Sequence, residues 1–226
     1  MMSNPENLRL RELWPGDYLK RNSVCFYVLD YLRHDDPDNP QFILDLKNTF
    51  DNESIQTLEA AREKAKDIIV RWAPEVMRRM NLRTCTMVCI PRAKAFDSYT
   101  DTQMYLLKAV SEAAQALSDR GVTDGTGAIR RVVSTKTTHL PDRTERVTAG
   151  GGREANTGDK PYPGITKKTC QIDAAQIRGR EILLVDDIYT GGVYIDEDCI
   201  QALYDAGAAR VVLFTLSRTT PRKETA

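Results

Sequence analysis

The stretch Glu181-Ile-Leu-Leu-Val-Asp-Asp-Ile-Tyr-Thr-Gly-Gly-Val-Tyr194 decides the fold of this chain. Its apolar run, Ile182 to Val185, has the length and composition of a buried strand in a parallel sheet. Asp186 and Asp187 follow, and a glycine-bearing turn then leads into a predicted helix over residues 195–206. Such a turn presents backbone N–H groups to an anion at a helix N-terminus. The combination predicts a sugar-phosphate site, with phosphate on the turn and sugar hydroxyls or Mg²⁺ on the acids.

An ordinary strand–turn–helix, with acids that merely cap the helix, is the alternative interpretation of this stretch. It leaves two adjacent acids directly after four buried apolar residues, which is costly unless a ligand compensates them. The ligand-binding interpretation is therefore the favoured one.

The residues Val185-Asp186-Asp187-Ile188-Tyr189-Thr190-Gly191-Gly192 resemble the signature with which type I phosphoribosyltransferases bind 5-phosphoribosyl pyrophosphate (PRPP). The tyrosine after Asp-Asp-Ile is most similar to the version in the competence protein F (ComF) family, whose N-terminal cysteine-rich zinc module is not apparent here. The resemblance implies transfer of a 5-phosphoribosyl group to a nitrogen acceptor, a base or an amine, with release of pyrophosphate, or the reverse reaction. It implies Mg²⁺ as cofactor and Asp186 and Asp187 as the catalytic acids, which hold the ribose hydroxyls and, through them, the metal. It assigns the 5′-phosphate of PRPP to the turn: Thr190, Gly191, Gly192, Val193 and Tyr194.

The turn departs from the family pattern at two positions. Gly191 and Tyr194 stand where the family usually has hydroxyl residues, so up to two hydrogen bonds to phosphate are lost. The acids Asp196, Glu197 and Asp198 would also repel phosphate unless they face away from it. A second hypothesis is therefore a non-catalytic regulator that senses PRPP or a nucleotide, or a competence-type accessory protein. A phosphohydrolase that uses the two aspartates for metal is a third.

A second predicted strand, residues 84–90, runs directly into the basic loop Pro91-Arg92-Ala93-Lys94-Ala95. A doubly wound sheet places its anion contacts in loops of this kind, and the resembling family binds pyrophosphate there. Arg92 and Lys94 are therefore the pyrophosphate-binding candidates. The alternative is that both are surface charges.

Residues 136–164 form a long irregular segment rich in glycine and proline. Long loops inside a compact domain are often lids, and the resembling enzymes close a flexible loop over PRPP to exclude water. The flexible-loop candidates are Lys136, His139, Arg143 and Arg146. A mobile, solvated loop with incidental charges is the alternative.

Alternating strands and helices predict an α/β fold with a doubly wound parallel sheet. We expect a phosphoribosyltransferase-like core over residues 81–220, a frayed tail over 221–226, and a mainly helical N-terminal extension over 1–80. The extension either packs on the core or forms a hood that touches substrate. Further predicted elements are a helix over 55–80 that Pro74 kinks or breaks, a helix over 101–120 capped by Asp101, and strands over 128–133, 166–172 and 211–216.

Composition limits the remaining classes of function. Thirty-two basic residues balance 32 acidic ones, so net charge indicates neither nucleic acid nor a membrane surface as partner. No apolar run approaches about 20 residues and the start of the chain lacks a signal-peptide core, which predicts a cytoplasmic protein. Five scattered cysteines predict neither a disulfide framework nor a zinc site. The family's habit suggests a homodimer.

Overall fold

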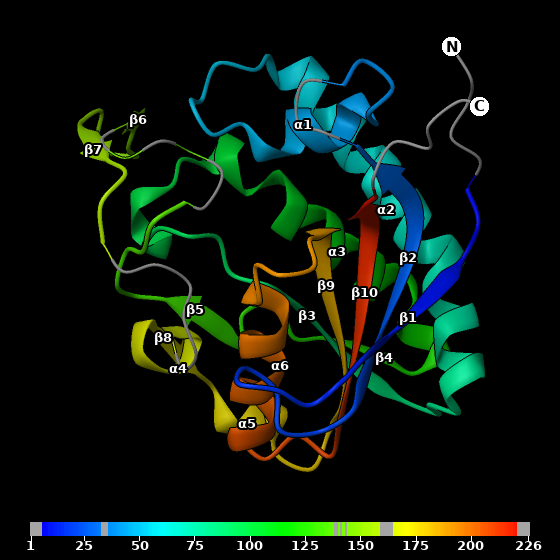
Figure 1. Cartoon of the computed structure of the whole chain (residues 1–226). Helices are drawn as coiled ribbons and strands as arrows, with labels where there is room; N and C mark the ends of the chain where they lie inside the picture. The colour runs from blue at the N-terminus through cyan, green and yellow to red at the C-terminus, as the bar shows by residue number, and fades with distance from the viewer. Residues whose placement is uncertain are drawn as a thin grey trace, which may run out of the picture.

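The computed structural model describes residues 6–32, 36–137, 140, 142, 144–158 and 165–220. Within these residues the main sheet has six strands in the order β1-β2-β10-β9-β3-β4 (Figure 1). The strand bounds are β1 Arg9–Leu13, β2 Ser23–Tyr31, β3 Cys85–Cys89, β4 Val122–Asp124, β9 Glu181–Tyr189 and β10 Arg210–Thr219. The main helices are α1 Gln41–Lys47, α2 Ile55–Met80, α3 Tyr105–Ala116 and α6 Ile195–Asp205.

The sheet is mixed, and this corrects the expectation of a purely parallel one. The five strands from β2 to β4 are mutually parallel, whereas the edge strand β1 pairs antiparallel with β2. Both β1 and β2 come from the first 80 residues, so the expected extension supplies strands of the sheet as well as the helices α1 and α2. The expected division of the chain near residue 80 stays a prediction.

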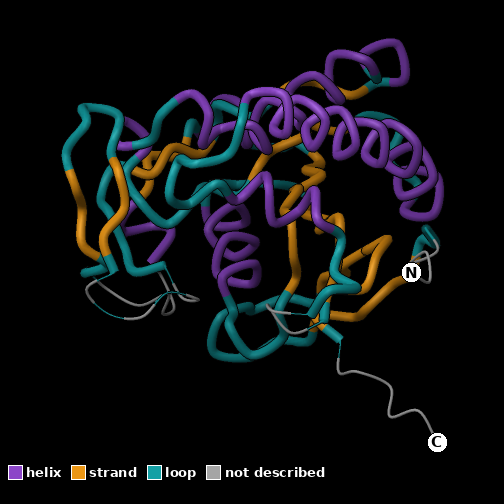
Figure 2. Tube along the Cα trace, turned by 90° about the horizontal axis from the view of Figure 1, so that it is seen from above, coloured by secondary structure: helices purple, strands orange, loops and turns teal. Residues whose placement is uncertain are grey.

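The sheet lies between two layers of side chains that its strands supply alternately, as the period of two requires. On β9, Leu183 and Val185 pack with α2 and α3, whereas Ile182 and Leu184 pack on the face of α6. Figure 2 shows the strands with helices on both sides of them. Burial on both faces explains why β9 reads as a continuous apolar run.

Several local predictions are confirmed and others are corrected. Helix α2 covers the predicted residues without interruption, so Pro74 lies inside a continuous helix and does not break it. The helix expected over 101–120 begins and ends in 3₁₀ turns, and Thr100 rather than Asp101 caps it, in a capping box with Gln103. The strand expected over 166–172 is instead the short helix α4 (Ile165–Thr169) followed by β8 (Cys170–Ile172).

Two small antiparallel ladders lie outside the main sheet. β5 (Ile129–Arg131), a shortened form of the strand predicted over 128–133, pairs with β8, and β6 (Glu145–Val147) pairs with β7 (Arg153–Ala155). The β6–β7 hairpin projects at the edge of the molecule in both views (Figures 1 and 2). Part of the predicted irregular segment is therefore ordered. The short helix α5 (Ala174–Ile177) leads into β9.

The described cysteines Cys25, Cys85, Cys89, Cys170 and Cys199 are free thiols, in line with the expected lack of a disulfide framework. Within the described ranges, no helix combines the length and the apolar character that crossing a membrane demands.

Candidate functional site

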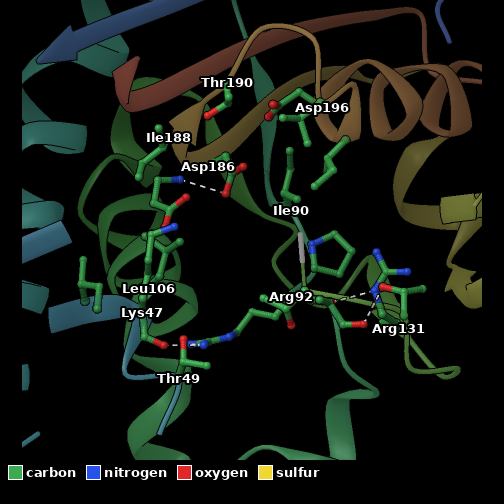
Figure 3. A pocket seen from close by; sticks show the side chains of 18 of the residues that line it. Lys47, Thr49, Ile90, Arg92, Leu106, Arg131, Asp186, Ile188, Thr190 and Asp196 are labelled. Carbon is green, nitrogen blue, oxygen red and sulfur yellow. Dashed lines mark hydrogen bonds and ion pairs between the residues drawn. The ribbon is translucent and has the colours of Figure 1, made fainter. Parts of the chain in front are cut away.

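A cavity of about 430 Å³ opens where the parallel strands β3 and β9 end. A volume in this range suits a small-molecule ligand. The loop after β3, the end of β9, the corner after α1 and residues 135–137 all contribute to its lining. In Figure 3, Asp186, Thr190 and Asp196 gather on one side of the cavity, and Lys47, Thr49 and Arg92 lie on the other. We call the side with Asp186, Thr190 and Asp196 the acid side, and the side with Lys47, Thr49 and Arg92, at the corner after α1, the corner side.

The acid pair lies within a strand and not after one, because β9 continues through both aspartates to Tyr189. The Asp187 N–H donates to Asp186 Oδ1 at 2.9 Å, and Asp187 Oδ2 lies 3.4 Å from Lys47 Nζ. Burial, together with the neighbouring Asp187 carboxylate, raises the pKa of Asp186 to about 8. Both predicted acids line the cavity.

The predicted phosphate turn is a tight reversal between β9 and α6. The Val193 N–H donates to the Thr190 carbonyl at 3.3 Å, and Gly192 has φ = 86°, a left-handed conformation that glycine adopts without strain. Thr190 and Val193 line the cavity, whereas Gly191, Gly192 and Tyr194 are not among its lining residues.

Tyr194 instead stacks face to face on Tyr18 from the loop between β1 and β2, with ring centroids 4.3 Å apart. The hydroxyl of Thr190 is engaged as well, because its Oγ1 lies 2.8 Å from Thr219 Oγ1 at the end of β10. The side-chain hydroxyls of this turn therefore add few hydrogen bonds to a phosphate beyond those that the backbone N–H groups can make.

Three consecutive acids in the first turn of α6 are all buried: Asp196, Glu197 and Asp198. Asp198 Oδ2 accepts from the Thr166 N–H, and Glu197 Oε1 accepts from the Tyr189 hydroxyl, each at 2.8 Å. Asp196 is only 4% exposed and lines the cavity, and its Oδ1 has no hydrogen-bond partner within the described residues. Burial and the neighbouring Asp186 raise the pKa of Asp196 well above its usual range.

The loop after β3 brings one of its two predicted cations to the cavity. Arg92 lines it, but its two terminal nitrogens donate to the carbonyls of Lys47 and Gln103. Lys94 does not line this cavity. Its side chain is buried, its ammonium donates to the Thr157 carbonyl at 3.3 Å, and burial lowers its pKa.

Two of the four flexible-loop candidates lie in the described part of the chain, and both line the cavity. Lys136 pairs with Asp142 at 2.7 Å. Arg146, on β6, is buried, pairs with Glu154 at 2.6 Å and stacks its guanidinium over the Tyr99 ring, 4.4 Å from the centroid. Arg146 thereby holds the β6–β7 hairpin against the 3₁₀ turn that contains Ser98. His139 and Arg143 lie outside the described residues.

Arg131, Tyr31 and Lys47 are among the lining residues of the cavity that sequence reasoning missed. Arg131 is 5% exposed and donates from Nε to the Arg92 carbonyl at 2.7 Å. Two adjacent arginines interrupt an otherwise apolar predicted strand. Because successive side chains of a strand point to opposite faces, one of the two has to be buried, and this pattern was a usable signal for a buried cation. No sequence pattern marks Tyr31 or Lys47, since the pairing of β2 with β10 brings Tyr31 to the ends of the core strands and a contact with Arg92 holds the backbone of Lys47 there.

A scan against protein-family models finds no match to this chain, and a search among curated proteins finds no significant one either.

Proposed function

We propose that this protein binds PRPP in the cavity and transfers its 5-phosphoribosyl group to a nitrogen acceptor, with release of pyrophosphate. One observation carries the proposal: Asp186 and Asp187 share a cavity of suitable size with a set of cations from separate segments. The cations are Lys47, Arg92, Arg131, Lys136 and Arg146. A sugar that carries several phosphates needs both kinds of group at once.

The chemistry divides between the parts of the cavity. Asp186 and Asp187 accept hydrogen bonds from the ribose hydroxyls, and the phosphate turn takes the 5′-phosphate beside Thr190 and Val193, its two residues that line the cavity. The cations Arg92, Arg131, Lys136 and Arg146 lower the energy of the charge that develops on the departing pyrophosphate. These cations contact acceptors of the protein itself, so their positions are fixed before a ligand arrives.

The proposal includes Mg²⁺, which would neutralise part of the pyrophosphate charge. Within the described residues no group of three or more metal-ligating side chains is placed to hold a metal ion. Asp186 and Asp187 would help to hold a metal ion that arrives with the substrate.

Exclusion of water follows from the same geometry. Transfer at the ribose anomeric carbon passes through an oxocarbenium-like state that water would capture. Lys136 and Arg146 border the cavity and belong to the segment that carries the β6–β7 hairpin. We propose that this segment covers the bound substrate.

Calorimetric titration of Mg²⁺–PRPP into the protein tests the proposal. We expect saturable binding, together with pyrophosphate release when a suitable nitrogen acceptor is present. An absence of heat at any Mg²⁺–PRPP concentration up to the millimolar range would contradict it.

A second candidate is a regulator that binds PRPP or a nucleotide without transfer. Gly191 favours it, because this position of the phosphate turn has no hydroxyl to donate to a bound phosphate. The outward stacking of Tyr194 on Tyr18 favours it too. Binding of Mg²⁺–PRPP with no pyrophosphate release across a broad panel of bases and amines would select this candidate.

A further inference from the structure

The corner side of the cavity is built around the end of helix α1, at Lys47, Asn48 and Thr49. Lys47 and Thr49 line the cavity, and segments distant in sequence hold the backbone of the corner. Arg92 donates to the Lys47 carbonyl. The amide nitrogen of Gln103 donates to the carbonyls of Asn48 at 3.3 Å and Thr49 at 3.1 Å.

The side chain of Asn48 stabilises the same corner through its own hydrogen bonds. It is 3% exposed and takes a left-handed conformation (φ = 30°), which few residues other than glycine adopt. Its Oδ1 accepts from the N–H groups of Asn52 and Glu53, at 3.1 and 3.2 Å, and its Nδ2 donates to the Thr102 carbonyl at 3.3 Å. Buried polar groups that are satisfied in this way fix one backbone geometry.

These hydrogen bonds hold the backbone of the corner and thereby position the Lys47 ammonium. It lies 3.4 Å from Asp187 Oδ2, and both side chains are largely shielded from solvent, at 24% and 18% exposure. An ammonium has three donors, so its contact with Asp187 leaves donors for a ligand in the cavity. Arg92 puts a second positive charge at the same corner.

The cavity surface beside Lys47 is mainly apolar and partly aromatic. Its residues are Tyr31, Leu46, Leu106 and Ile188. Apolar walls of this kind accept a flat ring, and a cation at their border selects a ring that carries a negatively charged oxygen.

We propose that the corner side is the acceptor subsite, and that Lys47 selects a planar nitrogen heterocycle that bears a carboxylate or an equivalent anionic oxygen. The inference rests on the proposed function and adds the class of acceptor to it. The ring packs on the apolar wall, its anionic oxygen accepts a hydrogen bond from Lys47, and its nitrogen faces the ribose held at Asp186 and Asp187.

Matched acceptors test the subsite, with nicotinate against nicotinamide and orotate against uracil as the pairs. Each is titrated into the protein with and without saturating Mg²⁺–PRPP, and pyrophosphate release is followed with each. We expect the carboxylate member of at least one pair to be preferred tenfold or more, in binding or in release.

Three variants separate the role of Lys47 from general damage. Lys47→Met should reduce the preference to within about threefold, whereas Lys47→Arg should keep most of it, because a guanidinium retains the charge. Lys64→Met is the matched control, since Lys64 lies on α2, is half exposed and pairs with Glu6. A thermal melt of each variant checks that the fold is intact.

The outcomes decide between the two proposals. Binding of Mg²⁺–PRPP without any preference for the carboxylate ring, or with a preference that survives in Lys47→Met, overturns the acceptor inference alone. Absence of Mg²⁺–PRPP binding overturns the proposed function, and the direct titrations of nicotinate and orotate then decide the subsite. If the unmodified protein binds neither acid, the subsite falls as well.

Discussion

The two sides of the cavity treat their buried polar groups in opposite ways. On the corner side, protein side chains contact the carbonyls of Lys47, Asn48 and Thr49. On the acid side, Asp196 presents a buried oxygen with no partner within the described residues. A satisfied corner is rigid in advance, whereas an unsatisfied buried acid must bind a proton or receive a donor from a ligand. The comparison therefore indicates that the corner side has a fixed geometry before a ligand binds, whereas the polar groups of the acid side are satisfied only when a proton or a ligand binds.

The largest effect should come from removing the charge that joins the two sides. Asp187→Asn should lower pyrophosphate release about 100-fold or more, because this carboxylate faces both the ribose position and Lys47. Steady-state assays with Mg²⁺–PRPP measure the loss. Asp119→Asn, at an exposed position in the 3₁₀ turn after α3, should leave the rate unchanged. An active Asp187→Asn protein would remove the acid pair from the mechanism.

Breaking the corner should cost folding stability. Gln103→Ala leaves the Thr49 carbonyl and the Thr100 N–H without the buried amide that joins them, so we expect a loss of about 2–3 kcal/mol in unfolding free energy. Denaturant unfolding measures it. Gln115→Ala is the control, because Gln115 is exposed and its side-chain amide donates to the hydroxyl of the nearby Ser111. Equal effects of the two substitutions would mean that the corner is not rigidly held.

We expect the buried acids of the acid side to make the unfolding free energy depend on pH. The folded-state pKa of Asp186 is raised to about 8 from a usual value near 3.8, so the folded protein holds a proton that the unfolded chain releases. Its contribution is fully present below about pH 4 and is lost as the pH rises towards 8. We expect the unfolding free energy to fall between pH 5 and 8 with a slope of up to about 1.4 kcal/mol per pH unit, the value for one proton.

Asp186→Asn should reduce this dependence, since an amide does not titrate in that range and Asp196 is then the remaining buried acid with a raised pKa. Unfolding curves at matched ionic strength across pH 5 to 8 compare the two proteins. A slope that persists unchanged in Asp186→Asn would assign the proton to another group.

The smallest effect concerns the outer surface of the phosphate turn. Tyr18→Ala removes the ring stacked on Tyr194 and should lower stability by about 1 kcal/mol. Trp14→Ala, in the same connection but 66% exposed, should change stability by less than about 0.5 kcal/mol. Thermal melts of both variants make the comparison. If Tyr18→Ala also tightens or weakens Mg²⁺–PRPP binding, the stack shapes the turn as well as covering it.

Local sequence determined the elements of the core. The apolar run before Asp186 is a central strand, residues 55–80 are one helix, and both acids line the cavity. These features were predictable because burial and helical periodicity show in the pattern of residues that are close in sequence. The sequence also marked Arg92 and Lys136 as cations of the cavity, since each belongs to a connection with strong turn or loop character. The chemistry proposed for them began from that pattern.

Only the tertiary structure decided what surrounds these residues. The pairing of β2 with β10 brings Tyr31 to the cavity, and contacts across more than 40 residues fasten Lys47 beside Asp187. The same packing turns Lys94 away, buries Asp196 beside Asp186 and commits the guanidinium of Arg92 to the carbonyls of Lys47 and Gln103. The physical reason is that burial and hydrogen bonding depend on which distant segments meet, and a local pattern of charge and hydrophobicity does not contain that information.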